Sequence, residues 1–291
     1  MFQNITVSFP GLGIEGGSID SVAFTLPFGE GFSVMWYGVC IAFGMLLAIA
    51  YAAWRCHQYK ISFDDLTDIA IFTILFGVVG ARLYYVIFSP NQFKTLWDVI
   101  NLRTGGLAIY GGIIAGAVTI VVVCLIKKIS WRKLYDCAAP GVMIAQAMGR
   151  WGNFFNGEAY GSIVEEGSPL YFLRMGLISN NTYYDFGTKN MVYVHPTFLY
   201  ESLWNVIGFI LINIFFKKKK FDAQIALYYF AWYGFGRMFI EGLRTDALFI
   251  GETGIRVSQL LGFLLFCVAT GLIVYGLIMT KKNLTVEVDA E

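Results

Sequence analysis

Charge is scarce in this chain. Only 14% of its 291 residues are Asp, Glu, Lys or Arg, and the formal net charge is +1. A near-neutral chain lacks the basic excess with which proteins attract nucleic acids, so a nucleic-acid partner is excluded. The chain is instead 57% hydrophobic, with a mean hydropathy of +0.62, which excludes an ordinary soluble domain.

Residues that bind metals or form disulfides are also few. Two histidines, His57 and His195, make a transition-metal cluster improbable. The cysteines are odd in number, lie in or beside apolar stretches and lack the paired spacing of a metal or redox site; they are Cys40, Cys56, Cys124, Cys137 and Cys267. We therefore expect no metal and no other cofactor, and we expect the cysteines to be buried by packing.

The first 31 residues contain no Lys or Arg, and no compact apolar run before a small-residue cleavage site. This segment does not match a removable signal peptide. We expect residues 1–31 to form an external arm that lies on the membrane.

Seven apolar stretches dominate the rest of the chain. At roughly 1.5 Å per residue, a helix of about 20 residues matches a hydrocarbon core of about 30 Å. The stretches are residues 32–54, 66–88, 105–126, 134–155, 198–216, 223–242 and 257–279.

Lys and Arg are distributed unequally between the two ends of these stretches. With the N-terminus outside, 12 of them lie at cytoplasmic ends and 6 lie outside, which predicts an outside N-terminus and a cytoplasmic C-terminus. Residues 157–194 are then too polar to enter lipid and too long for a simple turn, which predicts a small external head. The sequence thus predicts an all-α integral membrane protein with seven transmembrane helices. Its membrane domain covers residues 32–280, including the head, and a cytoplasmic tail covers residues 281–291.

Three arginines, Arg82, Arg150 and Arg237, lie inside apolar stretches, each in the outer third of its span. A guanidinium at membrane depth costs roughly 2.5 kcal/mol or more, so each must face a polar interior, and such residues indicate a functional site. Their common level predicts a membrane enzyme with an anionic substrate.

The densest polar segment is residues 149–161, which read GRWGNFFNGEAYG. Arg150 and Asn153 are three residues apart and share one face of a helix. The five donors of a guanidinium suit a phosphodiester, and an amide one turn away can bind a further oxygen. We expect Gly157 to end the helix and to turn Glu158 back over the site. The alternative is a structural ion pair between Arg150 and Glu158.

A second polar set lies in the sixth stretch. Tyr233, Arg237 and Glu241 are spaced four residues apart and form one stripe on a helix. Glu241 can hold the guanidinium through a salt bridge, and Arg244 and Asp246 continue the set just beyond the membrane. The stripe is either a structural ladder or part of the same site as the first set.

Two tyrosines lie at the same depth as the arginines. Tyr37 and Tyr110 each lie five residues after the outward start of their stretches, within roughly 10 Å of the arginine level. Close helix packing explains most small residues of the second and third stretches. The two Gly pairs of residues 105–112 also leave backbone, including that of Gly111, accessible to a lipid headgroup. We therefore expect five helices to offer polar groups to one pocket that opens toward the outer leaflet.

The run over residues 149–161 resembles the signature of bacterial prolipoprotein diacylglyceryl transferases, and the resemblance extends over nearly the whole chain. The other matching segments are Trp36-Tyr37-Gly38, Gly80-Ala81-Arg82-Leu83, residues 105–112, His195-Pro196 through Tyr200-Glu201, and Tyr233-Gly234-Phe235-Gly236-Arg237 through Glu241. The resemblance implies seven spans in a bacterial cell membrane and an active site at the outer leaflet. It also implies phosphatidylglycerol as donor and the lipobox cysteine of a lipoprotein precursor as acceptor.

The chemistry follows from the resemblance as well. The implied product is a thioether, so the thiol attacks carbon and glycerol-1-phosphate leaves. Arg150 and Arg237 would stabilise the charge that builds on phosphate, and their field would favour the thiolate. Glu158 or Glu241 would act as a base or orient the arginines. Tyr110, where many members carry His, would assist by hydrogen bonding, because a phenol is a poor base near neutral pH.

The residues expected to bind phosphatidylglycerol are Arg150, Asn153, Tyr37, Tyr233, Arg82 and Gly111. Two other functional classes compete with this interpretation. A transporter for an anionic solute would place polar groups near the midplane and show repeat symmetry. A structural scaffold would not need three intramembrane arginines.

Overall fold

The computed structural model describes residues 4–27, 31–89, 93, 95–102 and 105–288. The chain divides into two compact units. The first comprises Met1–Ala48 and Ala138–Glu291, and the second comprises Ile49–Cys137.

Each predicted apolar stretch coincides with a long helix. The seven helices are α1 (Trp36–Gln58), α2 (Phe63–Phe88), α4 (Ile109–Ile126), α5 (Trp131–Asn156), α7 (Thr197–Phe215), α8 (Gln224–Ile240) and α9 (Val257–Val288). Five are long and apolar enough to cross a membrane: α1, α2, α4, α9, and α7 together with the short 3-10 helix η5 (Phe216–Lys218) that follows it. The chain is therefore a mostly helical, multi-pass membrane protein.

Glycines mark two of the helix ends. Gly105 and Gly106 have φ values of +78° and +80°, left-handed conformations that interrupt a helix. Helix α4 consequently begins at Ile109 and not at residue 105, where the predicted span began. Gly157, with a φ of +59°, follows the last residue of α5, and its predicted role as the end of that helix is confirmed.

Helices α2 and α4 of the second unit approach closely because small residues meet between them. A Cβ atom on Gly80 would lie 2.2 Å from the Cβ of Ala115, and one on Gly111 would lie 2.4 Å from the carbonyl oxygen of Gly80. Neither position can carry a side chain without separating the helices. The predicted packing role of the small residues in these two stretches is confirmed.

Four of the five cysteines are buried as expected: Cys56, Cys124 and Cys137 in the core of the second unit, and Cys40 in the first. The expectation of burial is wrong for Cys267, which is exposed on α9. That helix also exposes large apolar side chains along its length, so a thiol, which behaves as a small apolar group, is accommodated there.

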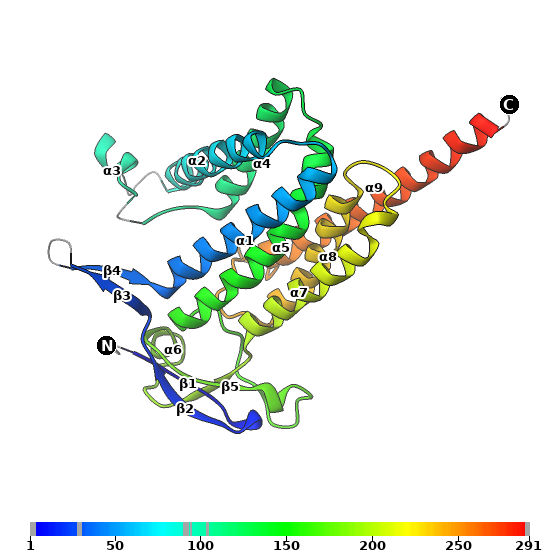
Figure 1. The fold of residues 1–291 in the computed structure, drawn as a ribbon. Coiled ribbons are helices and arrows are strands. Elements are labelled where there is room, and N and C mark those ends of the chain that lie inside the picture. The colour runs from blue at the N-terminus through cyan, green and yellow to red at the C-terminus, as the bar shows by residue number, and fades with distance from the viewer. Residues whose placement is uncertain (1–3, 28–30, 90–92, 94, 103–104, 289–291) are drawn as a thin grey trace. The chain divides into compact units, whose positions relative to one another are not determined.

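A four-stranded antiparallel sheet joins the N-terminal segment to the segment between α5 and α7. Its strands are β1 (Ile5–Phe9), β2 (Ile14–Ile19), β5 (Met175–Ile178) and β6 (Val192–Val194), in the order β2-β1-β5-β6 (Figure 1). Val7 of β1 lies opposite Leu177 of β5. The sequence predictions contained no strand, because a four-residue apolar run has no period that distinguishes a strand from a helix.

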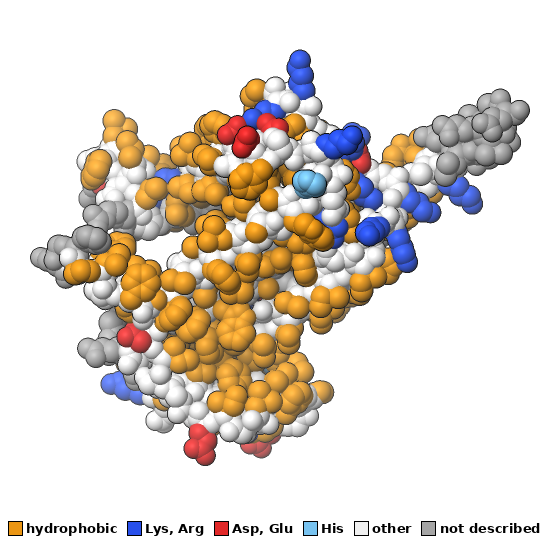
Figure 2. All heavy atoms as spheres, viewed as in Figure 1, with side chains coloured by type: hydrophobic (Ala, Val, Ile, Leu, Met, Phe, Trp, Pro, Cys, Tyr) orange, Lys and Arg blue, Asp and Glu red, His pale blue; other side chains and the backbone are white. Residues whose placement is uncertain are grey.

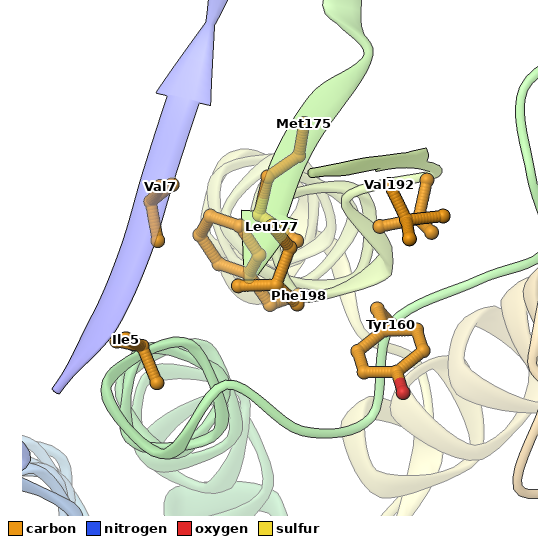
Figure 3. Close-up of a cluster of buried hydrophobic side chains, with 8 residues drawn as sticks. Ile5, Val7, Tyr160, Met175, Leu177, Val192 and Phe198 are labelled. Carbon is orange, nitrogen blue, oxygen red and sulfur yellow. The ribbon is translucent and has the colours of Figure 1, made fainter. Parts of the chain in front are cut away.

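The core of this head continues onto a long helix. Figure 3 shows Ile5, Val7 and Leu177 of the sheet close to Phe198, which belongs to the first turn of α7, and all four are buried in one cluster. The sheet is therefore anchored to the helix by apolar packing. A separate antiparallel pair, β3 (Val22–Leu26) and β4 (Phe32–Met35), leads directly into α1.

Hydrophobic side chains cover the flanks of the first unit's helices, whereas Lys and Arg gather around the connection between α7 and α8 (Figure 2). Ile207, Ile210 and Ile214 of α7 are exposed, and Lys217 and Lys218 are exposed at its end. Soluble proteins rarely expose so much contiguous apolar surface. Contact with lipid along the helix flanks accounts for it.

Candidate functional site

The end of α5 carries a chain of polar contacts. Arg150 Nη1 donates to Asn153 Oδ1 at 3.2 Å, and Asn153 Nδ2 donates to Glu158 Oε1 at 3.0 Å. Asn156 Nδ2 donates to the same carboxylate oxygen at 3.2 Å. The left-handed turn at Gly157 brings Glu158 back along the helix, as the sequence predicted. Arg150 and Asn153 share one face because they are one turn apart.

A glycine in the same segment lets α1 approach α5. A Cβ atom on Gly152 would lie 2.9 Å from Cδ2 of Tyr37. Beside this contact, the rings of Trp36 and Phe155 stack with centroids 5.2 Å apart. The structure therefore brings Tyr37 to the last turns of α5, beside the residues that carry the polar contacts.

The predicted stripe on α8 is present. Arg237 Nη2 forms an ion pair with Glu241, the first residue of the 3-10 turn η6 (Glu241–Leu243). Glu241 is buried, whereas the side chain of Arg237 is 12% exposed; Tyr233 lies one turn before Arg237 and is half-buried. A buried guanidinium needs such a partner, because an unpaired charge in a medium of low polarity is strongly unfavourable.

Glu201, in the second turn of α7, is shared by three arginines. Its Oε2 lies 2.7 Å from Arg150 Nη2, and its Oε1 lies 2.9 Å from Arg237 Nη1 and 3.4 Å from Arg244 Nη1. No role was predicted for Glu201. It is the one acidic residue of the apolar stretch 198–216, and an ionisable residue in such a stretch is itself a signal of a functional site.

The loop after η6 contributes a second ion pair. Arg244 binds Asp246 through Nε to Oδ1 at 2.9 Å and Nη2 to Oδ2 at 2.7 Å. Burial disfavours the charged form of each group, but their hydrogen bonds and opposite charges outweigh it. The pKa of Asp246 is therefore lowered and the pKa of Arg244 is raised.

Backbone pairing fixes this loop against the segment that follows α5. Gly161 N donates to the His195 carbonyl at 2.9 Å, and Ser162 N donates to the Leu243 carbonyl at 2.7 Å. A Cβ atom on Gly161 would lie 2.7 Å from the Cβ of His195 and 2.9 Å from the Leu243 oxygen, so only glycine fits. His195 is buried, and this burial lowers the pKa of its imidazole because it disfavours the charged form.

Arg82 has a different environment, inside the second unit. Its Nε donates to the carbonyl of Val99 at 2.8 Å. Its Nη1 donates to the carbonyls of Gly105 at 2.5 Å and Gly106 at 2.9 Å. Its Nη2 donates to the carbonyls of Asp98 at 2.6 Å and Asn101 at 2.9 Å. These carbonyls belong to the short helix α3 (Leu96–Ile100) and the loop after it, and they take up all five N–H groups of the guanidinium.

The glycines that precede α4 allow this arrangement. A Cβ atom on Gly106 would lie 2.7 Å from Arg82 Nη1, so the backbone reaches the guanidinium because Gly106 has no side chain. Gly111 is buried in the contact between α2 and α4, and Tyr110 is half-buried in the first turn of α4. Arg82, Tyr110 and Gly111 thus belong to the second unit, whereas the arginines bound by Glu201 belong to the first.

Accessibility distinguishes the arginines of the first unit. The side chain of Arg150 is 22% exposed, against 12% for each of Arg237 and Arg244. Three guanidinium groups around a shared carboxylate suit an anionic group such as a phosphate. Among the described residues, no group of three or more His, Cys, Asp or Glu side chains is arranged to hold a metal ion.

Comparisons with known proteins place the chain among relatives of one name. Residues 21–275 match the family model described as prolipoprotein diacylglyceryl transferase. The chain is 42% identical over 262 residues to a phosphatidylglycerol–prolipoprotein diacylglyceryl transferase of Clostridium kluyveri, covering 88% of this chain and 96% of the relative. Relatives of the same name are 44% identical in Streptococcus sanguinis (88% of this chain, 95% of the relative) and 43% identical in Listeria innocua (84% and 86%).

Proposed function

The chain belongs to the prolipoprotein diacylglyceryl transferase family, and from this premise we propose how its arginine cluster serves the reaction. The enzyme transfers the diacylglyceryl group of phosphatidylglycerol to the thiol of the lipobox cysteine in a lipoprotein precursor, the first step of lipoprotein maturation. The alternative of an anion transporter finds no support in these relatives.

The reaction forms a carbon–sulfur bond and breaks a carbon–oxygen bond. The precursor thiol releases its proton to water, and the thiolate attacks the glyceryl carbon that carries the phosphate. The bonding electrons leave with the phosphate oxygen, which departs as glycerol-1-phosphate. Negative charge therefore grows on the phosphate, and cations held in place in a pocket with little water stabilise that transition state.

Arg150 is the residue that we propose to bind the donor phosphate. It is the most exposed of the three clustered arginines, and two of its five N–H groups contact described residues. The guanidinium can therefore present a fork of donors to a phosphodiester. Asn153, beside it on α5, would bind a further oxygen of the headgroup. The accessible guanidinium of Arg150 is the observation that carries this assignment.

Arg237 would contribute to the field without being the main contact, because it is less exposed and already pairs with Glu201 and Glu241. We propose that Glu241 holds Arg237 and that Glu158, which accepts from two amide groups, holds Asn153. A thiolate formed in the field of the arginines needs no dedicated base.

Other residues predicted at the site have supporting roles in this proposal. Tyr37 packs beside the end of α5 and Tyr233 lies one turn from Arg237, so both would border the headgroup. Tyr110 would assist by hydrogen bonding. We propose that Arg82 organises the loop before α4, since its donors are taken by carbonyls, and that Gly111 serves helix packing.

We further propose that the chain crosses the bacterial cell membrane seven times and that its N-terminus lies outside. In this arrangement, residues 157–194 form an external head together with the strands of residues 1–31, and residues 281–291 form a cytoplasmic tail. The 12 to 6 partition of basic residues supports the orientation. A Ser168→Cys variant in intact cells should react with a membrane-impermeant thiol reagent beyond the labelling of the parent chain, and Lys218→Cys should not. The reverse pattern would overturn the orientation.

The transferase activity is tested with the purified full-length protein. Labelled phosphatidylglycerol and a lipobox peptide should yield a lipidated peptide, and replacing the peptide cysteine by serine should abolish the product. Uptake of an anionic solute into vesicles without peptide lipidation would contradict the proposed function.

A further inference from the structure

We infer that Glu201 is a positioning residue that holds Arg150 and Arg237 in the orientation needed for phosphate stabilisation. The inference rests on the proposed function, in which Arg150 binds the donor phosphate. Glu201 is 3% exposed and accepts from guanidinium groups of α5, of α8 and of the loop after η6. One carboxylate therefore joins three separate elements of the chain.

The two oxygens of Glu201 have different partners. Oε2 binds Arg150, whereas Oε1 binds Arg237 and Arg244. A carboxylate has about four lone-pair positions, enough for these contacts, and its two oxygens bind the first arginine and the other two separately. The spacing of the cations is thereby set by the width of the carboxylate.

Glu201 itself is held in place. Asn205 Nδ2 donates to the Glu201 carbonyl at 2.9 Å, and Asn205 is 3% exposed. The Thr197 hydroxyl, at the start of the same helix, donates to the carbonyl of Ala159 in the segment after α5. The backbone on both sides of Glu201 is therefore held, by Asn205 within the helix and by Thr197 against the segment after α5, and a carboxylate on a held backbone can orient a flexible guanidinium.

The three arginines do not depend on Glu201 equally. Arg237 has a second carboxylate partner in Glu241, and Arg244 has one in Asp246. Among the described residues, Glu201 is the one carboxylate paired with Arg150. Loss of the Glu201 charge would therefore release the most accessible arginine, the one proposed to contact the phosphate.

Release of Arg150 has opposite effects on binding and on turnover. Without Glu201, freed N–H groups and uncompensated positive charge bind an anion more tightly in the ground state. The N–H donors of Arg150 are no longer held where negative charge develops on the phosphate. The transition state is therefore stabilised less than the bound ground state is. This separation of binding from turnover is a result that a purely structural role would not produce.

The test compares full-length Glu201→Gln with wild type in mixed micelles of detergent and phosphatidylglycerol, with a lipobox peptide as acceptor. Glutamine keeps the shape and removes the charge. We expect kcat to fall by about tenfold or more, while KM for phosphatidylglycerol and the inhibition constant of glycerol-1-phosphate stay unchanged or fall. Glu165→Gln, an exposed acidic residue of the head, is the matched control and should leave all three values unchanged.

A second variant, Glu201→Asp, keeps the charge but shortens the reach. It should recover part of the lost kcat with a KM close to wild type, and it replaces Glu201→Gln as the test if the latter does not fold. Thermal unfolding and size-exclusion chromatography together measure the folded fraction of each variant. A Glu201→Gln enzyme with kcat within about twofold of wild type would overturn the inference. An activity loss equal to the loss of folded protein, with unchanged kinetic constants, would overturn it as well.

Failure of the inference is distinguishable from failure of the proposed function. Wild-type turnover in Arg150→Lys would remove the phosphate role from Arg150, whatever Glu201→Gln does. If Arg150→Lys loses turnover while the Glu201 variants keep the kcat and KM of wild type, only the positioning role of Glu201 is refuted.

Discussion

Arg82 and Arg150 are alike in the sequence and different in the structure. Each lies inside an apolar stretch, near its C-terminal end. All five N–H groups of Arg82 are taken by backbone carbonyls of the second unit. Arg150, in the first unit, pairs with Glu201 and Asn153 and stays 22% exposed. One guanidinium is saturated by its own chain, and the other retains capacity for a ligand.

The type of partner matters as much as the number. Carbonyl dipoles bind a guanidinium without cancelling its charge. The carbonyls around Arg82 all belong to one backbone segment, and their hydrogen bonds to Arg82 fix the conformation of that segment. Carboxylates offset charge, but Glu201 alone is shared by three arginines, so positive charge remains in excess around that carboxylate. An arginine inside an apolar stretch therefore points most directly to ligand binding when some of its donors remain available.

The largest expected effect is at Arg150. Arg150→Lys keeps the charge but loses the planar fork of donors, so we expect kcat to fall by about a hundredfold or more, equivalent to roughly 3 kcal/mol of transition-state stabilisation. The protein should still insert and fold, because the side chain is partly exposed. Steady-state lipidation of a labelled peptide measures the change.

Arg132→Lys is the matched control for this variant. Arg132 is exposed at the opposite end of the same helix, and its replacement should leave turnover unchanged. Turnover of Arg150→Lys at the wild-type level would reject Arg150 as the phosphate ligand and would remove the contrast with Arg82.

Substitution of Arg82 should lower the stability of the protein and leave its affinity for phosphatidylglycerol unchanged. A lysine has three donors on one nitrogen and cannot reach the carbonyls on both sides of a guanidinium. Hydrogen bonds to charged groups contribute about 1.5–3 kcal/mol each, so we expect Arg82→Lys to destabilise the buried site by roughly 3 kcal/mol. Thermal unfolding in detergent should detect this loss, while the folded fraction keeps its KM for phosphatidylglycerol. A stable Arg82→Lys protein with a raised KM would instead identify Arg82 as a lipid ligand.

The features that the sequence predicted correctly are local. The long helices, the shared face of Arg150 and Asn153, and the pair of Arg237 and Glu241 depend on spacings of one helical turn or on apolar length. Helical periodicity reports such neighbours directly. The family resemblance supplied the chemistry, which the residues alone suggested only as an anionic substrate.

The features that the sequence did not predict depend on contacts between distant residues. Glu201 meets Arg150 and Arg237 across separations of 51 and 36 residues, and β1 pairs with a strand near residue 176. No periodicity encodes such pairings. The carbonyl partners of Arg82 were not predicted either, because burial in an apolar stretch reveals the need for partners but not which partners meet it.

The smallest expected effect concerns Tyr110, which belongs to the same unit as Arg82. If the field of the arginines forms the thiolate, Tyr110→Phe keeps the ring and removes only the hydroxyl. The lost hydrogen bond should cost about 1 to 2 kcal/mol, or roughly tenfold in kcat. Tyr110→Ala should cost more, because it also removes packing around the start of α4. Folding is monitored by thermal unfolding, so that lost activity is assigned to chemistry alone. Complete inactivity of a well-folded Tyr110→Phe enzyme would mean that the phenol takes part in proton transfer. The second unit would then supply a reacting group as well as a scaffold, and a mechanism without a base would have to be withdrawn.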